Sequence, residues 1–212
     1  MLLLAFRQWG GSCLSKLNGQ FSFAVWDRQD RSVFAARDRL GEKPLFFAVA
    51  NGNKFVLASE IRAIIASQLI TPQLDPESVD AYLNLMYVPP NRTIYQNIHS
   101  LPPGHQMTWR DEQLSCERYW EPKLSTISID KQEAITETRR LVDQAVNRQM
   151  VADTTVGAFL SGGYDSSTIV GLMAKHASGP VKTFAVGFGD LINELPFARD
   201  VLGNATPTTL RS

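Results

Sequence analysis

The residues with the clearest potential for chemistry lie in a short loop rich in glycine and serine. Residues 161–167 read Ser-Gly-Gly-Tyr-Asp-Ser-Ser, directly after an apolar run at 155–160 and directly before a helical run at 168–175. A β-branched strand that leads through two glycines into a helix leaves backbone N–H groups unpaired beside the positive end of the helix dipole. The sequence therefore predicts a phosphate-binding loop.

The side chains of this loop suit a phosphate ligand. The two glycines let the backbone approach phosphate oxygens, and Ser166 and Ser167 supply hydroxyl donors. Asp165 would repel a phosphate unless a cation lay between them, so we expect this carboxylate to bind Mg²⁺. The structural alternative is a strand-to-helix turn that has good capping residues and binds nothing.

The spacing of the loop narrows the kind of nucleotide chemistry. It differs from G-x-x-x-x-G-K-[ST], which excludes at this site the proteins that hold β- and γ-phosphates with a loop lysine. The S-G-G-x-D-S pattern after a strand instead resembles the loop of the ATP pyrophosphatases, enzymes that split ATP between its α- and β-phosphates. This resemblance implies a PP-loop that holds pyrophosphate, with ATP and Mg²⁺ as the cofactors.

The elements around the loop are predicted to form a βαβ unit. A helix with one apolar stripe is expected over 131–150, then a strand to Leu160, the loop, a helix that ends before Gly179, and a strand over 181–186. Ligands of such sheets bind beyond the carboxyl ends of the strands, so an adenine could lie between Leu160 and Val186. Both residues equally suit the buried end of a strand.

The first 120 residues have a different pattern. Alternating residues predict an antiparallel meander of strands at 20–27, 32–37, 45–50 and 54–59, and helices follow at 60–67 and 76–87. Four prolines make 88–104 irregular, and a hairpin is expected at 106–119 around Asp111-Glu112. With a linker at about 120–130, the predicted fold class is α+β followed by α/β.

Composition excludes several classes of protein. The 212 residues are 44% hydrophobic, and Lys plus Arg and Asp plus Glu each number 21, so no charge excess favours a nucleic-acid or membrane partner. Cys13 and Cys116 have no C-x-x-C partner and no zinc-like spacing to histidine, and we interpret both as reduced. No apolar run approaches the ~20 residues that span a bilayer, and no secretory leader is evident, so the expected location is the cytoplasm.

Several longer segments resemble the glutamine-hydrolysing asparagine synthetase family, from about residue 3 to residue 199. Three segments look like the second half of its glutaminase domain: residues 17–27 (LNGQFSFAVWD), 36–45 (ARDRLGEKPL) and 58–63 (ASEIRA). Residues 101–105 (LPPGH) resemble its connector, and 159–167 with 183–188 (TFAVGF) resemble its synthetase domain. The combination is specific, although each motif alone would be weak.

The resemblance implies a fold, two domains and a reaction. Residues 1–122 would be the C-terminal part of a class II glutamine amidotransferase (Ntn-type) sheet domain plus the connector. Residues 123–212 would be the N-terminal part of a parallel ATP-pyrophosphatase (adenine nucleotide alpha hydrolase-like) domain. In the implied reaction of asparagine biosynthesis, aspartate is adenylated by ATP, and ammonia from glutamine then displaces AMP to form asparagine.

Site residues carry over only where this sequence matches the family's motif. Asp165 would be the catalytic residue and would hold Mg²⁺ through pyrophosphate. The implied contacts to ATP or pyrophosphate come from Leu160, Ser161, Gly162, Gly163, Asp165, Ser166, Ser167 and Val186. The implied partners are the small molecules aspartate, glutamine or ammonia, and ATP, and a homodimer is compatible with the family.

The sequence departs from the family at both ends. The family's glutaminase nucleophile is an N-terminal cysteine, whereas Leu2 follows Met1 here and Cys13 lies within the chain, so no glutaminase nucleophile is assigned. The family pattern ends near Val201. We interpret the chain as a fragment truncated at both ends and expect it to be inactive alone.

Three alternatives remain open. A β-lactam synthetase or a lasso-peptide cyclase uses the same scaffold on another acceptor. A non-catalytic nucleotide-binding or interaction module would retain the loop without the reaction. An ATP pyrophosphatase that modifies tRNA or makes GMP would explain 161–167 but not 17–60.

Overall fold

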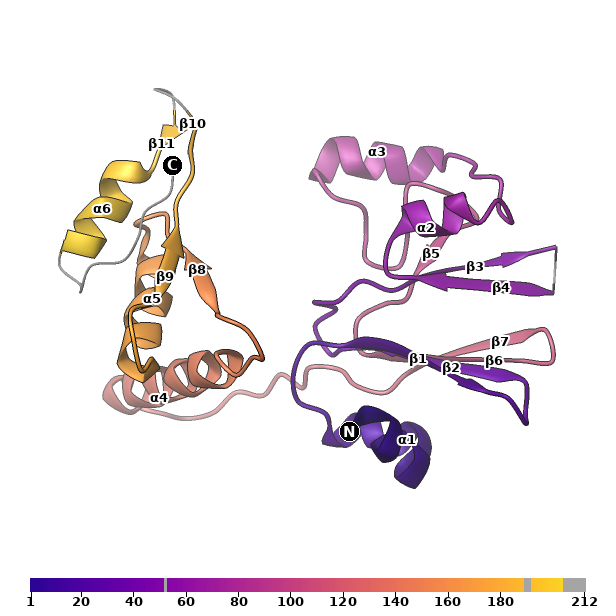
Figure 1. Cartoon of the computed structure of the whole chain (residues 1–212), viewed down its shortest axis with the longest axis horizontal. Helices are drawn as coiled ribbons and strands as arrows, with labels where there is room; N and C mark the ends of the chain where they lie inside the picture. The colour runs from indigo at the N-terminus through magenta and orange to yellow at the C-terminus, as the bar shows by residue number, and fades with distance from the viewer. Residues whose placement is uncertain (52, 189–191, 204–212) are drawn as a thin grey trace. The chain divides into compact units, whose positions relative to one another are not determined.

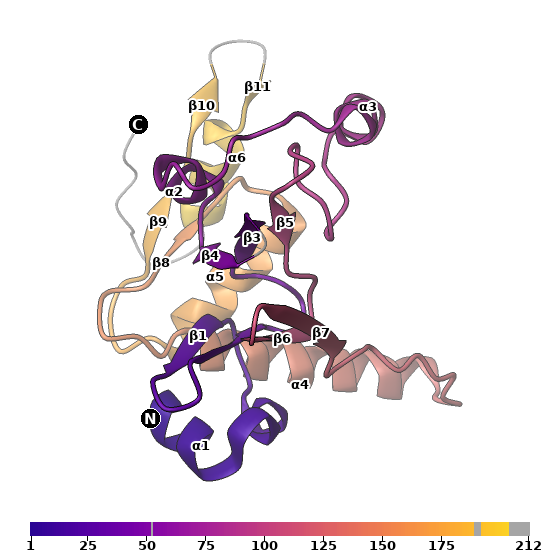
Figure 2. The same cartoon turned by 90° about the vertical axis from the view of Figure 1, so that its right-hand side faces the viewer.

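The computed structural model describes residues 1–51, 53–188 and 192–203, which form two compact units, Met1–Leu124 and Ser125–Ser212 (Figures 1 and 2). The sequence places the domain boundary between residues 122 and 123. Within the described residues no helix is long and apolar enough to cross a membrane.

The first unit contains two antiparallel sheets (Figure 1). One has the strand order β1-β2-β6-β7 and the other has the order β4-β3-β5. Their bounds are Ser22–Asp27 (β1), Ser32–Arg37 (β2), Phe46–Ala50 (β3), Lys54–Ala58 (β4), His99–Ser100 (β5), His105–Arg110 (β6) and Gln113–Arg118 (β7). The predicted hairpin is confirmed, because β6 and β7 pair around Asp111 and Glu112, whose positive φ values of 49° and 63° suit a tight hairpin turn.

The predicted single meander is wrong. The first four strands do form as two hairpins, but β2 pairs with β6, and β3 begins a second sheet. The reason lies in the side chains, which are apolar on both faces of β2 and β3. Ala35, Phe47 and Met107 share a core between the sheets, so the second hairpin packs across this core against the first instead of extending the same sheet.

Helical segments cover the outer faces. α1 (Leu2–Trp9) and a 3₁₀ helix (Gly10–Lys16) place Phe6, Cys13 and Leu14 against Phe34 and Ala36 of β2. On the other sheet, α2 (Ile61–Ala66) buries its apolar side against β3. A third helix, α3 (Pro76–Leu85), begins after Asp75 as predicted, although the Asp75 carboxylate accepts a bond from the Ser78 hydroxyl at 2.6 Å instead of capping a backbone N–H.

The chain crosses between the sheets at Arg37-Asp38. The Arg37 guanidinium donates to the carbonyl oxygens of Leu101 and Gly41 at 2.7 Å each and of Lys43 at 2.8 Å. Gly41 has φ +70°, and a side chain there would meet the ring of Pro103 at 2.7 Å. These contacts explain why the R-D-x-x-G pattern occurs at this crossing.

The second unit contains the expected βαβ arrangement. It consists of α4 (Lys131–Gln149), β8 (Gly157–Phe159), α5 (Tyr164–His176) and β9 (Lys182–Phe184), followed by β10 (Gly187–Phe188), β11 (Ile192–Asn193) and α6 (Leu195–Gly203). β8 and β9 pair in parallel, with Ala158 opposite Thr183. Val146 of α4 packs with Met173 of α5 and with Val181.

A polar contact also joins α4 to α5. Asp143 Oδ1 accepts a bond from Lys175 Nζ at 3.0 Å and lies 2.9 Å from His176 Nε2. These two bonds, from Lys175 first and then from His176, lower the pKa of the Asp143 carboxyl. The carboxylate therefore secures the C-terminal end of α5, the helix whose first turn carries the predicted site.

Candidate phosphate-binding site

The predicted loop lies between β8 and α5, as expected from the order of elements. The predicted start of the helix at residue 168 is too late, because α5 begins at Tyr164 with Gly163 as its N-cap. Asp165, Ser166 and Ser167 therefore belong to the first turn of the helix rather than to the loop. Tyrosine, aspartate and serine are tolerated early in a helix, which sequence reasoning underestimated.

Because α5 begins at Tyr164, the unpaired backbone donors of its first turn lie at residues 164–166. The first bond of the helix runs from the Ser167 N–H to the Gly163 carbonyl oxygen at 3.0 Å. The N–H groups of Tyr164, Asp165 and Ser166 precede that bond and have no carbonyl partner within the helix. They are the kind of donor that holds phosphate oxygens at a helix N-terminus.

Two serine side chains link the ends of the loop. The hydroxyl oxygens of Ser161 and Ser166 lie 3.0 Å apart, and the Ser161 N–H donates to Ser166 Oγ at 3.3 Å. The Gly163 N–H donates to Ser161 Oγ at 3.4 Å. The spacing of five residues thus brings both hydroxyl groups to one point. Each hydroxyl has a single proton and one of the two protons lies between the two oxygens, so the bonded pair has at most one proton left for an anion.

Gly162 is needed for the shape of the loop. It has φ +83°, a conformation that residues with a side chain rarely adopt. A Cβ atom there would also meet Phe197 and Ala198 of α6, with the backbone nitrogen of Ala198 only 2.8 Å away. Sequence reasoning missed this contact with α6, since nothing in the local pattern links residues so far apart in the chain.

Asp165 and Ser167, two polar residues that the sequence predicts as ligands, differ in their exposure to solvent. Asp165 is exposed and is the only acidic residue in the first turn of α5. The Ser167 hydroxyl oxygen is buried and has no hydrogen-bond partner, which is unusual for a buried polar atom. An exposed carboxylate can reach a hydrated Mg²⁺, whereas the unpaired Ser167 hydroxyl would become available to a ligand only after the atoms that cover it move.

The two residues predicted beside adenine lie at neighbouring strand ends. The Leu160 N–H donates to the Phe184 carbonyl oxygen at 2.8 Å, whereas its side chain is 1% exposed within a core that includes Ala185. Val186 is 53% exposed. Val186 can therefore offer a side chain to a ligand, while Leu160 is buried and its N–H is already bonded.

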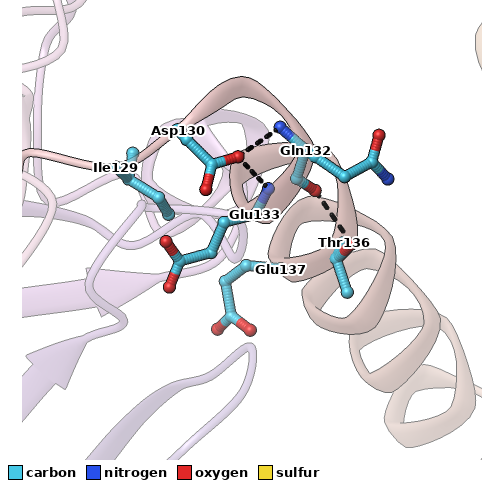
Figure 3. Close-up of a pocket in the computed structure, with 6 residues that line it drawn as sticks. All are labelled: Ile129, Asp130, Gln132, Glu133, Thr136 and Glu137. Carbon is cyan, nitrogen blue, oxygen red and sulfur yellow. Dashed lines mark hydrogen bonds between the residues drawn. The ribbon is translucent and has the colours of Figure 1, made fainter.

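A separate hollow of about 380 Å³ lies at the start of α4 (Figure 3). There Asp130 accepts the N–H groups of Gln132 at 2.7 Å and Glu133 at 2.9 Å, as the dashed lines show. The hollow is lined by Ile129, Asp130, Gln132, Glu133, Thr136 and Glu137. With three carboxylates and no basic side chain in its lining, it is unsuited to a phosphate ligand.

The residues at the loop fit a phosphate ligand accompanied by a metal ion. The unpaired donors at 164–166, the two hydroxyls at 161 and 166 and the free Ser167 hydroxyl suit phosphate oxygens. No group of three or more His, Cys, Asp or Glu that could hold a metal ion occurs among the described residues. A magnesium ion would thus share its coordination between Asp165, phosphate oxygens and water, which is its usual arrangement with nucleotides.

Comparisons with known families match both units. Residues 1–120 match the family described as glutamine amidotransferase domain, and residues 137–207 match the family described as asparagine synthase. Among solved structures, a glutamine phosphoribosylpyrophosphate amidotransferase from B. subtilis aligns with 81% of this chain and 34% of its own, at 16% identity. Its TM-score of 0.33 is too low to support an argument about the fold.

Similar curated proteins are mostly asparagine synthetases. "Asparagine synthetase [glutamine-hydrolyzing] 3" from Bacillus subtilis is 37% identical over 198 residues, covering 89% of this chain and 31% of the relative. "Asparagine synthetase [glutamine-hydrolyzing] 1" from the same organism is 33% identical, covering 89% and 29%. A Penicillium rubens protein named an amidase is 32% identical, covering 82% and 26%. The chain thus spans about a third or less of the length of these relatives.

Proposed function

The chain belongs to the glutamine-hydrolysing asparagine synthetase family, a family of ligases, and from this we propose that residues 160–167 and Val186 bind ATP for amide formation. The single observation that carries the proposal is the loop after β8. There Gly162 at φ +83°, the paired hydroxyls of Ser161 and Ser166 and the unpaired N–H groups of α5 meet at one point.

The proposed substrates are aspartate, ATP and ammonia derived from glutamine. An oxygen of the aspartate side-chain carboxylate attacks the α-phosphorus of ATP, and the bond to the bridging α–β oxygen breaks. The products of this step are aspartyl adenylate and pyrophosphate. Ammonia then attacks the acyl carbon, AMP leaves, and a proton is lost to give the amide of asparagine.

In this reaction the chain's own residues act on the leaving group. Negative charge accumulates on pyrophosphate as the phosphorus–oxygen bond breaks, and fixed donors placed there stabilise the transition state. The Ser161, Ser166 and Ser167 hydroxyls and the first N–H groups of α5 would supply those donors. Asp165 would hold Mg²⁺, which supplies positive charge between the carboxylate and the phosphates.

The test is the affinity for MgATP, measured by isothermal titration calorimetry on the 212-residue chain. Asp165→Asn removes the metal-binding charge, and Ser161→Ala removes a hydroxyl donor. Each is expected to weaken binding about tenfold, the loss of ~1.4 kcal/mol that one charge-assisted bond represents. Far-ultraviolet circular dichroism should show an unchanged fold.

A matched control is Asp153→Asn, which removes an exposed carboxylate elsewhere in the same unit. MgATP affinity should stay at the level of the unaltered chain in this variant. Unchanged affinity in both Asp165→Asn and Ser161→Ala would refute the roles proposed for these residues.

A further inference from the structure

Two glycines of the second unit lie against the same turn of α6. A side chain on Gly162 would meet the backbone carbon of Phe197 at 2.5 Å and the backbone nitrogen of Ala198 at 2.8 Å. A side chain on Gly187 would meet Cδ1 of Leu195 at 2.8 Å. Gly162 follows β8 and Gly187 follows β9, so the start of α6 contacts the segments that leave both parallel strands.

The helix α6 is itself anchored in the core of this unit. Ala198 is fully buried and Leu202 is 8% exposed, and both belong to the apolar cluster that contains Leu160. At its start, the Leu195 N–H donates to Asn193 Oδ1 at 3.1 Å. Moving α6 away from the loop would therefore expose apolar side chains to water, which makes α6 a firm support.

We infer that the first turn of α6 positions the phosphate loop, acting on the ligand only through the two glycines. This inference rests on the proposed function. A loop supported from outside needs little rearrangement when it binds, so less of the binding energy is lost to ordering. Leu195 and Phe197 are then positioning residues that do not touch phosphate.

Gly187→Ala tests this contact directly. Gly187 is not among the glycines with positive φ, so alanine is allowed by the backbone. The added methyl group would meet chiefly Leu195, at 2.8 Å from Cδ1 and 3.1 Å from Cγ, with Asn193 Oδ1 next at 3.3 Å. The affinity for magnesium pyrophosphate, measured by calorimetry on the 212-residue chain, should fall about tenfold because α6 and the loop must shift.

The same substitution made in a Leu195→Ala variant distinguishes a positioning effect of α6 from a general loss of structure. Leu195→Ala removes the side chain that the methyl group would strike, and by loosening the contact it should lower pyrophosphate affinity severalfold. In that background, Gly187→Ala should cause no further loss, because the two changes act on one contact and are not additive. If Gly187→Ala alone does not fold, the Leu195→Ala variant still tests the inference.

Gly171→Ala is the matched control. This glycine lies in α5 with no atom within 4 Å of the position of an added Cβ, so the same substitution should leave pyrophosphate affinity unchanged. Thermal unfolding followed by circular dichroism shows whether each variant remains folded.

The outcomes are distinct. If Gly187→Ala lowers pyrophosphate affinity equally in both backgrounds, or if neither Gly187→Ala nor Leu195→Ala lowers it, the inference is overturned while the proposed function stands. If the unaltered chain does not bind magnesium pyrophosphate, the proposed function is overturned together with the inference.

Discussion

The Asp38 side chain accepts four backbone hydrogen bonds in the first unit. Its carboxylate is 1% exposed and accepts backbone N–H groups from Lys43 at 2.9 Å, Glu42 at 3.0 Å, Leu40 at 3.1 Å and Phe21 at 3.3 Å. Burial acts to raise its pKa, but the four bonds together act more strongly, so the pKa of Asp38 lies below its usual value. The residue is structural: it holds the crossing between the sheets.

Replacing Asp38 should destabilise the first unit in a pH-dependent way. Asp38→Asn leaves backbone donors without a charged acceptor and should lower the free energy of unfolding by ~3 kcal/mol at pH 7. Because the folded-state pKa is lowered, this contribution is complete above the unfolded pKa of about 3.9 and is lost as pH falls through the folded pKa. Urea unfolding of the chain and the variant at pH 7 and pH 3 measures the change.

The destabilisation caused by Asp38→Asn should therefore shrink at pH 3. Comparing the variant with the unaltered chain at each pH cancels the effect of the other carboxyl groups. A difference that is the same at both values would contradict the assigned cause.

The two cysteines lack the properties of a glutaminase nucleophile. Cys13 is fully buried, and burial raises the pKa of its thiol. Burial and then the charge of Glu117 raise the pKa of Cys116. Both thiols are thus protonated near neutral pH, whereas the thiolate is the form that attacks an amide.

We therefore expect the 212-residue chain to release no glutamate from glutamine. A coupled glutamate assay on purified protein, with heat-denatured protein as the blank, provides the measurement. Glutamate release that disappears in Cys13→Ala or in Cys116→Ala would show that this expectation is wrong.

At the scale of elements, the sequence predicted which helices and turns form more reliably than it predicted where a helix begins or which strands pair. The apolar stripe of α4 and the turn at Asp111-Glu112 depend on neighbours in sequence, and both were predicted. The start of α5 was placed four residues late because helix propensity at Tyr164 is weak. There Gly162 turns the chain at φ +83° and Gly163 is the N-cap, so α5 begins directly after the two glycines.

The cap of α4 allows a prediction at this scale. Asp130 accepts two backbone N–H groups at the helix start, so Asp130→Ala should lower the free energy of unfolding of the second unit by ~1 kcal/mol. Urea denaturation followed by circular dichroism measures this loss. Asp153→Ala is the control for removal of an exposed aspartate, and an equal loss in that variant would argue against capping as the cause.

At the scale of the whole chain, the two units are joined by an irregular segment. Residues 121–128 are exposed and belong to no helix or strand. The first unit owes its core to pairs of strands far apart in sequence, such as β2 and β6, while the second is built around neighbouring elements. Proteases cut exposed segments of this kind in preference to paired strands.

Limited trypsin digestion should therefore cut first at Lys123, which is exposed and is followed by Leu124. The expected products are residues 1–123 and 124–212, identified by mass spectrometry of the intact fragments. Early cleavage at Arg37, whose guanidinium is bonded to three backbone carbonyls, would contradict this description of the first unit.

The sequence alone determined the features that depend on near neighbours. The order of strand, loop and helix around Ser161–Ser167, the hairpin at β6–β7 and the family of the chain all follow from short motifs. Only the tertiary structure decided that β2 pairs with β6, that the Leu160 side chain is buried, and that α6 supports Gly162. These outcomes depend on which apolar surfaces, far apart in the sequence, pack against one another. Many pairings of such surfaces compete, and the choice between them depends on the whole fold rather than on any local run of residues.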